Sequence, residues 1–297
     1  MLAVVLACFA VGVVLQRTTS WSTRLVAPLD RAVIGVTLPA LVLAKLPDLA
    51  LGGDLVVPVG AAWGAGALAA GLVLVAARRH GWSRATTGAL LLVTPLGNTT
   101  FLGLPMVDSL LGDEALARAL AFDQVGTFLG LAIYGSVVAA RWGHGRTGWR
   151  PIAARLLPFP PFLAVLASFA LRLVDLPDGL VDGLADVGQL TAPLAMLTVG
   201  LRFRLVPSAE SRVPAAWCLF IKMAVMPAAV AAAAALAGGL ADPAWDASIL
   251  EAAMPPMVTA GVVAAQSDLD GDLASTVVGL GLLLALVTGP LLALLLR

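Results

Sequence analysis

Charged residues are scarce in this chain. They make up 12% of its 297 residues, whereas hydrophobic residues make up 60%, and the mean hydropathy is +0.97. A composition this apolar excludes an ordinary soluble protein and is typical of an integral membrane protein. The formal net charge is zero, so no basic surface indicates nucleic acid and no acidic tail indicates a basic partner.

Cysteine is nearly absent, and so are the motifs of membrane enzymes. Cys8 and Cys218 lie in apolar runs without metal-binding or redox spacing, so we expect buried structural residues rather than metal ligands. No HExxH, GxSxG or GxxxxGK occurs, which argues against a zinc protease, a serine hydrolase and an ATP-driven pump. Asp270-Gly271-Asp272 begins like the metal-binding motif of phospholipid head-group transferases, but Ser275 stands where that motif needs Arg. The sequence therefore predicts neither an enzyme nor a cofactor.

Long apolar runs are what the chain does contain, and they predict an all-α membrane protein. A helix needs about 20 residues to span roughly 30 Å of hydrocarbon. The first run, Met1–Leu15, lacks the basic start of a secretory signal and is expected to remain as a helix. Ten runs are predicted to span the membrane, near 1–15, 26–44, 55–77, 86–111, 114–140, 152–173, 184–201, 213–237, 245–266 and 273–296.

The connections between these runs alternate in charge. The odd-numbered connections and the run ends beside them hold 13 of the 18 Lys and Arg residues, whereas the even-numbered connections and their adjoining run ends hold only Lys45, Arg118 and Arg172. Because Lys and Arg concentrate in cytoplasmic loops, the odd-numbered connections should be cytoplasmic. Both termini are then predicted on the outer face of the cell membrane. The acidic loop 268–272 departs from the pattern, but acidic residues weigh little in this rule.

Five runs in each half predict an inverted repeat. The first repeat would cover residues 1–140, a short basic cytoplasmic linker 141–151, and the second repeat 152–297. Thr37–Leu43 in the second run resembles Thr191–Leu197 in the seventh, and both have proline as their third residue. An odd number of runs per repeat places the two repeats in opposite orientations in one membrane domain.

Helix-breaking residues interrupt the fourth and the ninth run at corresponding positions. Pro95 and Pro105 interrupt the fourth run, and Pro255 and Pro256 the ninth. At membrane depth a helix can break only where protein or a water-filled cavity satisfies the freed backbone groups. Paired interruptions in two halves are a sequence pointer to the midplane site of a secondary transporter. A pair of simple proline kinks is the structural alternative.

The residues around these interruptions are suited to binding a small anion. They combine small residues with polar side chains, and proline is also favoured at a helix start. Thr99 or Thr100 could cap the following half-helix, whose N-terminal end favours negative charge. The predicted substrate-binding residues are Gly97, Asn98, Thr99, Thr100 and Gly103 in the fourth run and Thr259 and Gly261 in the ninth.

Ionisable and polar residues at membrane depth are rare and are candidates for function. Lys222 could be a counter-charge for an anionic substrate, and Asp123 with its neighbour Gln124 could titrate a proton or coordinate an ion. The alternative is a buried Asp123–Lys222 pair that only orients helices. Glu251 and Lys45 are expected to lie at the membrane interface.

Asn98-Thr99-Thr100-Phe101-Leu102-Gly103-Leu104-Pro105 resembles the auxin efflux carrier family, PIN-like secondary transporters whose bacterial members include malonate carriers. The stretch Ala253–Val258 and the segment around Pro193 support this resemblance, which covers essentially the whole chain. It implies ten helices in two inverted five-helix repeats, with the fourth and ninth crossing at the centre.

The resemblance also implies a function. It implies elevator-like transport of a small organic anion, either a malonate-like dicarboxylate or an auxin-like monocarboxylate, through the lipid bilayer. The substrate site carries over to Asn98 and, more weakly, to Thr99 and Thr100, whereas Thr259 stands where members often have Asn. H⁺ or Na⁺ is a candidate coupling ion, and a homodimer is left open. A membrane enzyme, or a receptor or channel on the same fold, is the alternative.

Overall fold

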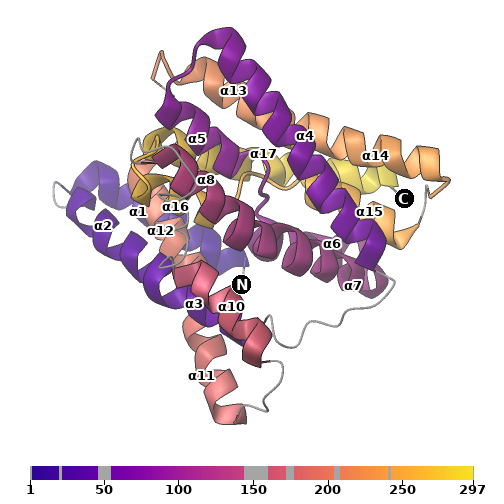
Figure 1. Cartoon of the computed structure of the whole chain (residues 1–297), viewed down its shortest axis with the longest axis horizontal. Coiled ribbons are helices and arrows are strands. Elements are labelled where there is room, and N and C mark those ends of the chain that lie inside the picture. Colours follow the sequence, from indigo (N-terminus) through magenta and orange to yellow (C-terminus); the bar gives the residue numbers. More distant parts are fainter. Residues whose placement is uncertain are drawn as a thin grey trace.

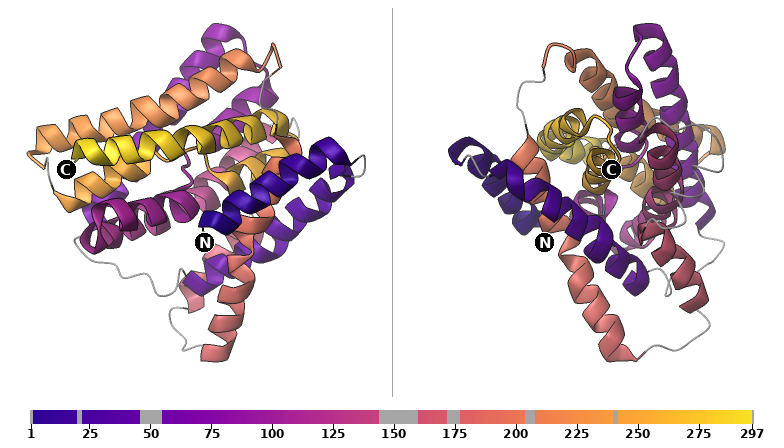
Figure 2. Two further views of the ribbon diagram at one scale, coloured as in Figure 1. Left: turned by 180° about the vertical axis from the view of Figure 1, so that it is seen from behind. Right: turned by 60° about the vertical axis from the view of Figure 1, so that its left-hand side comes forward.

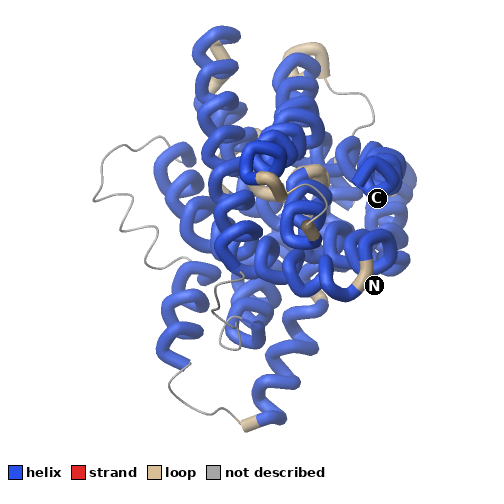
Figure 3. The backbone as a smooth tube through the Cα atoms, turned by 90° about the vertical axis from the view of Figure 1, so that its right-hand side faces the viewer, coloured by secondary structure: helices blue, strands red, loops and turns tan. Residues whose placement is uncertain are grey.

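The structure is a computed structural model that describes residues 2–19, 22–45, 55–143, 160–171, 177–203, 208–239 and 242–296. Helices dominate these ranges, joined by short loops (Figures 1 and 3). Most of the predicted basic linker, from residue 144 onward, lies outside the described residues.

Among the described residues, six helical spans are long and apolar enough to cross a membrane. The chain is therefore a multi-pass membrane protein, as its composition predicts, whereas the count of ten spans and the inverted repeat stay predictions. The remaining apolar helices are shorter or interrupted. The six spans are Arg24–Ala44, Val56–His80, Glu114–Trp142, Gly179–Leu201, Arg212–Ala237 and Gly271–Leu296.

Several long spans consist of α-helices joined through π-helical turns, here labelled η. The N-terminal part comprises α1 (Leu2–Thr18), α2 (Ser22–Ala32), η1 (Val33–Thr37), α3 (Leu38–Lys45), α4 (Val56–His80), α5 (Arg84–Val93), η3 (Thr99–Gly103), α6 (Leu104–Leu111), α7 (Asp113–Ala121), η4 (Phe122–Phe128), η5 (Leu131–Gly135) and α8 (Ser136–Trp142). The C-terminal part comprises α10 (Pro160–Leu171), α11 (Asp178–Gln189), α12 (Thr191–Arg202), α13 (Arg212–Phe220), η7 (Ile221–Val225), α14 (Met226–Ala237), α15 (Pro243–Ala252), α16 (Val258–Gln266) and α17 (Gly271–Leu296).

The helices form two groups. The first, which we name the scaffold group, contains α1, α2, α3, α10, α11 and α12 and fills the lower left of Figure 1. The second, which we name the crossing group, contains α4 to α8, α13 to α15 and α17. Helix α16 packs against α2 and α12 on one side and against α5 and α17 on the other. It therefore connects the two groups.

Close backbone contact holds the scaffold group together. Helix α1 lies along α12 (Figure 2), and a Cβ on Gly12 would stand 2.9 Å from the Cα of Gly200. Small residues at such crossings let helices approach closely, which replaces the hydrophobic driving force that is missing inside a bilayer. Neither glycine can gain a side chain without moving a helix.

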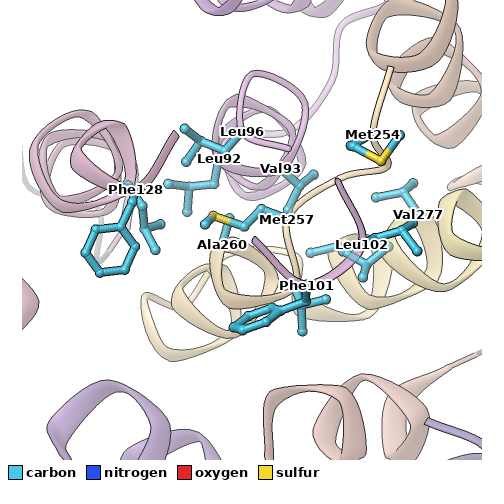
Figure 4. Close-up of a cluster of buried hydrophobic side chains, with 14 of the residues drawn as sticks. Leu92, Val93, Leu96, Phe101, Leu102, Phe128, Met254, Met257, Ala260 and Val277 are labelled. Carbon is cyan, nitrogen blue, oxygen red and sulfur yellow. The ribbon is translucent and has the colours of Figure 1, made fainter. Parts of the chain in front are cut away.

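The buried centre of the crossing group surrounds the two interrupted runs. Leu92, Val93 and Leu96 from the first interruption lie near Met257 of the second, and Leu102 and Met254 face Val277 of α17 (Figure 4). A Cβ on Gly281 of α17 would stand 2.7 Å from Cδ of Pro256. This apolar packing fixes the position of both interruptions.

Candidate substrate site at the crossing of two interrupted helices

Each interruption separates two helices by a short non-helical stretch. In the first, α5 ends at Val93 and the helical path resumes with η3 at Thr99. In the second, α15 ends at Ala252 and α16 begins at Val258. Proline offers no backbone N–H and its ring obstructs the preceding turn, so Pro95 and the Pro255-Pro256 pair account for both breaks.

The two interruptions are hydrogen-bonded to each other. The N–H of Asn98 donates to the carbonyl of Pro255 at 2.8 Å, and the N–H of Met257 donates to the carbonyl of Leu96 at 2.9 Å. Gly97 and Pro256 form an antiparallel bridge between these bonds. Backbone groups that would be orphaned at membrane depth thus satisfy one another.

The prolines differ in detail from the sequence prediction. Pro105 does not interrupt the chain, because η3 passes directly into α6 and Pro105 lies in the first turn of that helix, where a missing N–H is tolerated. Pro255 and Pro256 precede the start of α16, so neither is its first residue. Asn98 is the residue before η3, and its side chain makes no capping hydrogen bond.

The carboxylate of Asp123 is hydrogen-bonded to the first two residues of η3. Its Oδ1 accepts hydrogen bonds from the hydroxyls of Thr99 and Thr100, both at 2.6 Å, and its Oδ2 accepts one from Nε2 of Gln124 at 2.8 Å. The two threonines therefore bind a carboxylate instead of capping the half-helix. Asp123 is fully buried in η4, and π-helical turns within α-helices frequently mark functional positions.

Lys222 has different partners from those predicted. Its Nζ donates to the carbonyl of Ala252 at 2.9 Å and lies 3.7 Å from Sδ of Met226. Its electrostatic partner among the carboxylates is Glu251. The alternative of a structural Asp123–Lys222 pair is not what these contacts show. The ammonium instead lies at the C-terminal end of α15, where the helix dipole favours a cation.

Glu251 does not lie at an interface, so that expectation is wrong. It is 0% exposed, and its carboxylate packs directly against the Cα of Gly103 in η3. Within the described residues, neither Oε atom has a hydrogen-bond partner. Buried polar groups are almost always hydrogen-bonded, so this carboxylate is unusual. Lys45 has no described side chain.

The remaining predicted residues divide into two kinds. Asn98 is 2% exposed, and no hydrogen bond is formed by its side-chain amide in the described part of the chain, which leaves it available to a ligand. Thr259, in the first turn of α16, is equally buried, and its hydroxyl has no partner there. Gly261 packs against Val278 and Ala274 of α17, so its role in the described structure is to pack two helices together.

A cavity of about 500 Å³ opens beside the crossing. It lies between α4, the first interruption, η4, η5 and η7, and its wall is mainly apolar. Lys222 supplies a cation, and Gly97 lets that ammonium approach the backbone, because a Cβ at Gly97 would stand 3.1 Å from Nζ. Aromatic side chains complete the wall, namely Trp63, Phe122 and Tyr134.

A second cavity of about 310 Å³ lies between the scaffold group and η3. Thr100, Pro105 and Asp108 line it from the crossing group, and Gly188 and Gln189 line it from α11. Among the described residues, its lining includes Asp108 and no Lys or Arg. An anion is therefore favoured in the first cavity rather than in the second.

Sequence reasoning missed two parts of this site. Glu251 was placed at an interface although it is the one charged residue between Ala247 and Met257, directly before the Pro255-Pro256 break. That isolation was the available signal. The aromatic wall carried no local signal, because Trp63 and Tyr134 belong to separate apolar helices that only the folded chain brings together.

Comparison with known proteins gives two kinds of match. Residues 151–293 match the profile of a family described as membrane transport protein. The chain is 30% identical over 266 residues to an uncharacterized transporter of Methanothermobacter thermautotrophicus, covering 89% of this chain and 86% of the relative. It is also 35% identical over 119 residues, 38% of each chain, to an uncharacterized transporter of Methanocaldococcus jannaschii.

Proposed function

The chain belongs to the auxin efflux carrier family of membrane transport proteins, and we propose that it is a secondary carrier that moves a small organic anion by alternating access. The observation that carries this proposal is the cavity beside the crossing, because it combines apolar walls with Lys222, the one buried Lys or Arg among the described residues. A membrane-buried ionisable residue that faces a cavity is expected to serve a ligand or ion pathway.

The chemistry of this cavity favours a monocarboxylate with an apolar body. One ammonium group can neutralise one carboxylate, whereas a dicarboxylate such as malonate would place a second charge against an apolar wall. The cavity is large enough for an aromatic ring, and Trp63, Phe122 and Tyr134 offer faces for stacking. Asn98 follows the lining residue Gly97 in the chain but is not itself among the described residues that line the cavity. Its amide makes no hydrogen bond within the described residues, and we assign it to orienting the carboxylate.

The arrangement of the two helix groups supports alternating access. The scaffold group meets the crossing group through α16, through packing of α12 against α17, and along the second cavity. Sliding of the crossing group along the scaffold would carry the substrate site across the membrane, and transporters with interrupted helices commonly move in this rigid-body manner. H⁺ or Na⁺ remains the candidate driving ion. We place the carrier in the cell membrane with both of its termini on the outer face.

Counterflow in proteoliposomes tests this function. Vesicles preloaded with unlabelled indole-3-acetate or malonate should take up the labelled anion faster than empty vesicles, because a carrier exchanges substrate across the membrane. We expect the stronger stimulation with indole-3-acetate. A channel would show no stimulation by internal anion, and an enzyme would return a chemically altered label. Either result would contradict a carrier.

The variant pair Ala67→Trp and Gln189→Trp locates the substrate. Ala67 lines the first cavity and Gln189 the second, so each tryptophan fills one cavity and leaves the other open. We expect Ala67→Trp to abolish binding of indole-3-acetate to purified protein and Gln189→Trp to preserve it. The reverse pattern would move the site to the second cavity.

A further inference from the structure

We propose that Glu251 is the proton-binding site of this carrier, and that it couples proton and anion movement by competing with the substrate carboxylate for Lys222. This inference rests on the proposed function and adds the identity of the driving ion and of the residue that binds it. Three buried groups carry it: Asp123, Lys222 and Glu251.

The two buried carboxylates differ in how they are satisfied. Asp123 accepts three hydrogen bonds, from Thr99, Thr100 and Gln124. Such donors stabilise the ionised form of a carboxylate. Glu251 has no donor on either oxygen within the described residues. A buried carboxylate without donors is the one that gains most from taking up a proton.

The charges around Glu251 are few. Helix α15 packs against α4, α6, α7, α14, α17, η3 and η4. The charged groups that act on Glu251 are Asp123 of η4, which repels its negative charge, and Lys222 of η7, which attracts it. Lys222 in turn interacts with Glu251 and with the thiol of Cys218. The charge of Lys222 is thus the one that favours ionised Glu251.

Charge counting then links the anion to a proton. With all three groups ionised, Asp123 and Glu251 contribute two negative charges and Lys222 one positive charge, which leaves one net negative charge in the buried centre. An incoming carboxylate would raise this to two net negative charges. If Glu251 takes up one proton as the anion enters, the net charge stays the same. Burying an additional uncompensated charge in a low-dielectric centre is strongly unfavourable.

A proton fits this centre better than a metal cation. The ammonium of Lys222 already occupies the end of α15, 2.9 Å from the carbonyl of Ala252, and would repel a second cation. Both oxygens of Asp123 are engaged by protein donors. No cluster of three or more His, Cys, Asp or Glu side chains suited to a metal occurs among the described residues.

The proposed cycle moves one proton with each anion. In the empty site, the ammonium of Lys222 stabilises ionised Glu251 through its charge, without a direct hydrogen bond between the two side chains. When the substrate carboxylate takes that ammonium as its partner, an Oε of Glu251 accepts a proton from water and becomes a neutral acid. Release on the other side reverses both steps, with the proton returning to water. The loaded and empty sites then carry equal charge while they cross the membrane.

Proton uptake during binding tests this directly. Purified protein in weakly buffered detergent solution, with a pH indicator, is titrated with indole-3-acetate and with malonate. We expect the wild type to take up about one proton for each anion bound, and Glu251→Gln to bind without proton uptake. Glu114→Gln, an exposed glutamate at the start of α7, should behave as the wild type. Binding without proton uptake by the wild type would overturn the coupling role of Glu251 and leave the carrier function standing. Failure of both anions to bind would overturn the function and this inference together.

Transport separates proton coupling from a structural role of Glu251. In proteoliposomes an outside-acid gradient of one pH unit should let the wild type accumulate the anion up to about tenfold, the equivalent of about 1.4 kcal/mol. Glu251→Gln mimics the protonated acid, so it should retain counterflow and lose this accumulation. Glu251→Asp keeps the proton site and should retain both. Accumulation by Glu251→Gln, or loss of counterflow by a folded Glu251→Gln, would overturn the proposal.

Discussion

Glycines serve different purposes in the scaffold group and in the crossing group. In the scaffold group Gly12 faces Gly200, backbone against backbone, with 2.9 Å between the Cα of Gly200 and the place of a Cβ on Gly12. In the crossing group Gly97 faces the ammonium of Lys222, and Gly103 faces the carboxylate of Glu251. The same residue type admits a neighbouring helix in one region and a charged side chain in the other.

This difference distinguishes a region of close backbone packing from the region in which we propose that substrate binds. Close backbone contact stabilises a helix pair in a membrane, and nothing in the contact between Gly12 and Gly200 can titrate or bind. At Gly97 and Gly103, by contrast, the missing side chain leaves room for the charged groups of Lys222 and Glu251, which we propose respond to a ligand and a proton. Substitutions in the two regions should therefore fail in different measurements.

The largest effect should come from the scaffold group. Gly200→Leu forces a side chain into the backbone of α1, and overpacking of this kind costs about 1–3 kcal/mol or more. We expect little folded protein and a clearly lower thermal midpoint in detergent. Gly60→Leu is the matched control, because nothing lies within 4 Å of a Cβ at Gly60 on α4. Equal midpoints for the two variants would refute the close α1–α12 contact.

The next largest effect on stability should distinguish the two buried carboxylates, Asp123 and Glu251. Asp123→Ala strands the hydroxyl of Thr99 and the amide of Gln124 without their acceptor, at about 1–3 kcal/mol for each buried unsatisfied group. Glu251→Gln removes no hydrogen bond in the described structure. The thermal midpoint should therefore fall markedly for Asp123→Ala and stay near the wild-type value for Glu251→Gln. A larger fall for Glu251→Gln would reverse the assignment.

A functional rather than structural effect is expected at Gly103. In Gly103→Ala the added methyl group takes the place of the Glu251 carboxylate, which can rotate away because it ends a flexible side chain. Accumulation driven by a pH gradient should drop while the thermal midpoint changes little. Combining Gly103→Ala with Glu251→Gln should be no worse for accumulation than Glu251→Gln alone, since both act on one group. Additive losses in accumulation would show that Gly103 acts independently of Glu251.

The smallest change in thermal stability is expected at Asn98. Its amide makes no hydrogen bond within the described residues, so Asn98→Ala should keep the wild-type thermal midpoint. Losing one hydrogen bond to a charged ligand costs about 1.5–3 kcal/mol, which predicts a weakening of indole-3-acetate binding of at least tenfold. Calorimetric titration measures it. Unchanged affinity would remove Asn98 from the site.

Local sequence patterns were sufficient to predict where the helices are interrupted, but not which groups contact the buried charged side chains. Pro95 and Pro255 act on their own backbone within one turn, so their effect can be predicted from the sequence. The bond from Lys222 to the carbonyl of Ala252 depends on how η7 and α15 pack, and 30 residues separate the two. For that reason the sequence suggested Asp123 as the partner of Lys222 and placed Glu251 at an interface.

The same distinction between local patterns and contacts made by packing applies to the site residues. Asn98, Gly97 and Gly103 were proposed from the sequence because they form part of a short motif at the break, and their role in substrate binding stays a prediction. Thr99 and Thr100 were predicted as helix caps, but a carboxylate from another helix, Asp123, binds their hydroxyls. The cavity wall was beyond prediction, since it is assembled from helices that carry no common pattern.

The central claim is that the crossing binds an anion through the ammonium of Lys222. Measuring the binding of indole-3-acetate to a variant that lacks this charge tests the claim most directly. Lys222→Met keeps the length of the side chain, and the pair Lys222→Met with Glu251→Gln leaves no stranded charge at the end of α15. Losing a buried charge partner costs about 2–5 kcal/mol of binding, so affinity should fall by about thirtyfold or more in the folded double variant. Arg79→Met, at an exposed position of α4, should bind as the wild type. Wild-type affinity in a folded Lys222→Met, Glu251→Gln variant would contradict the account.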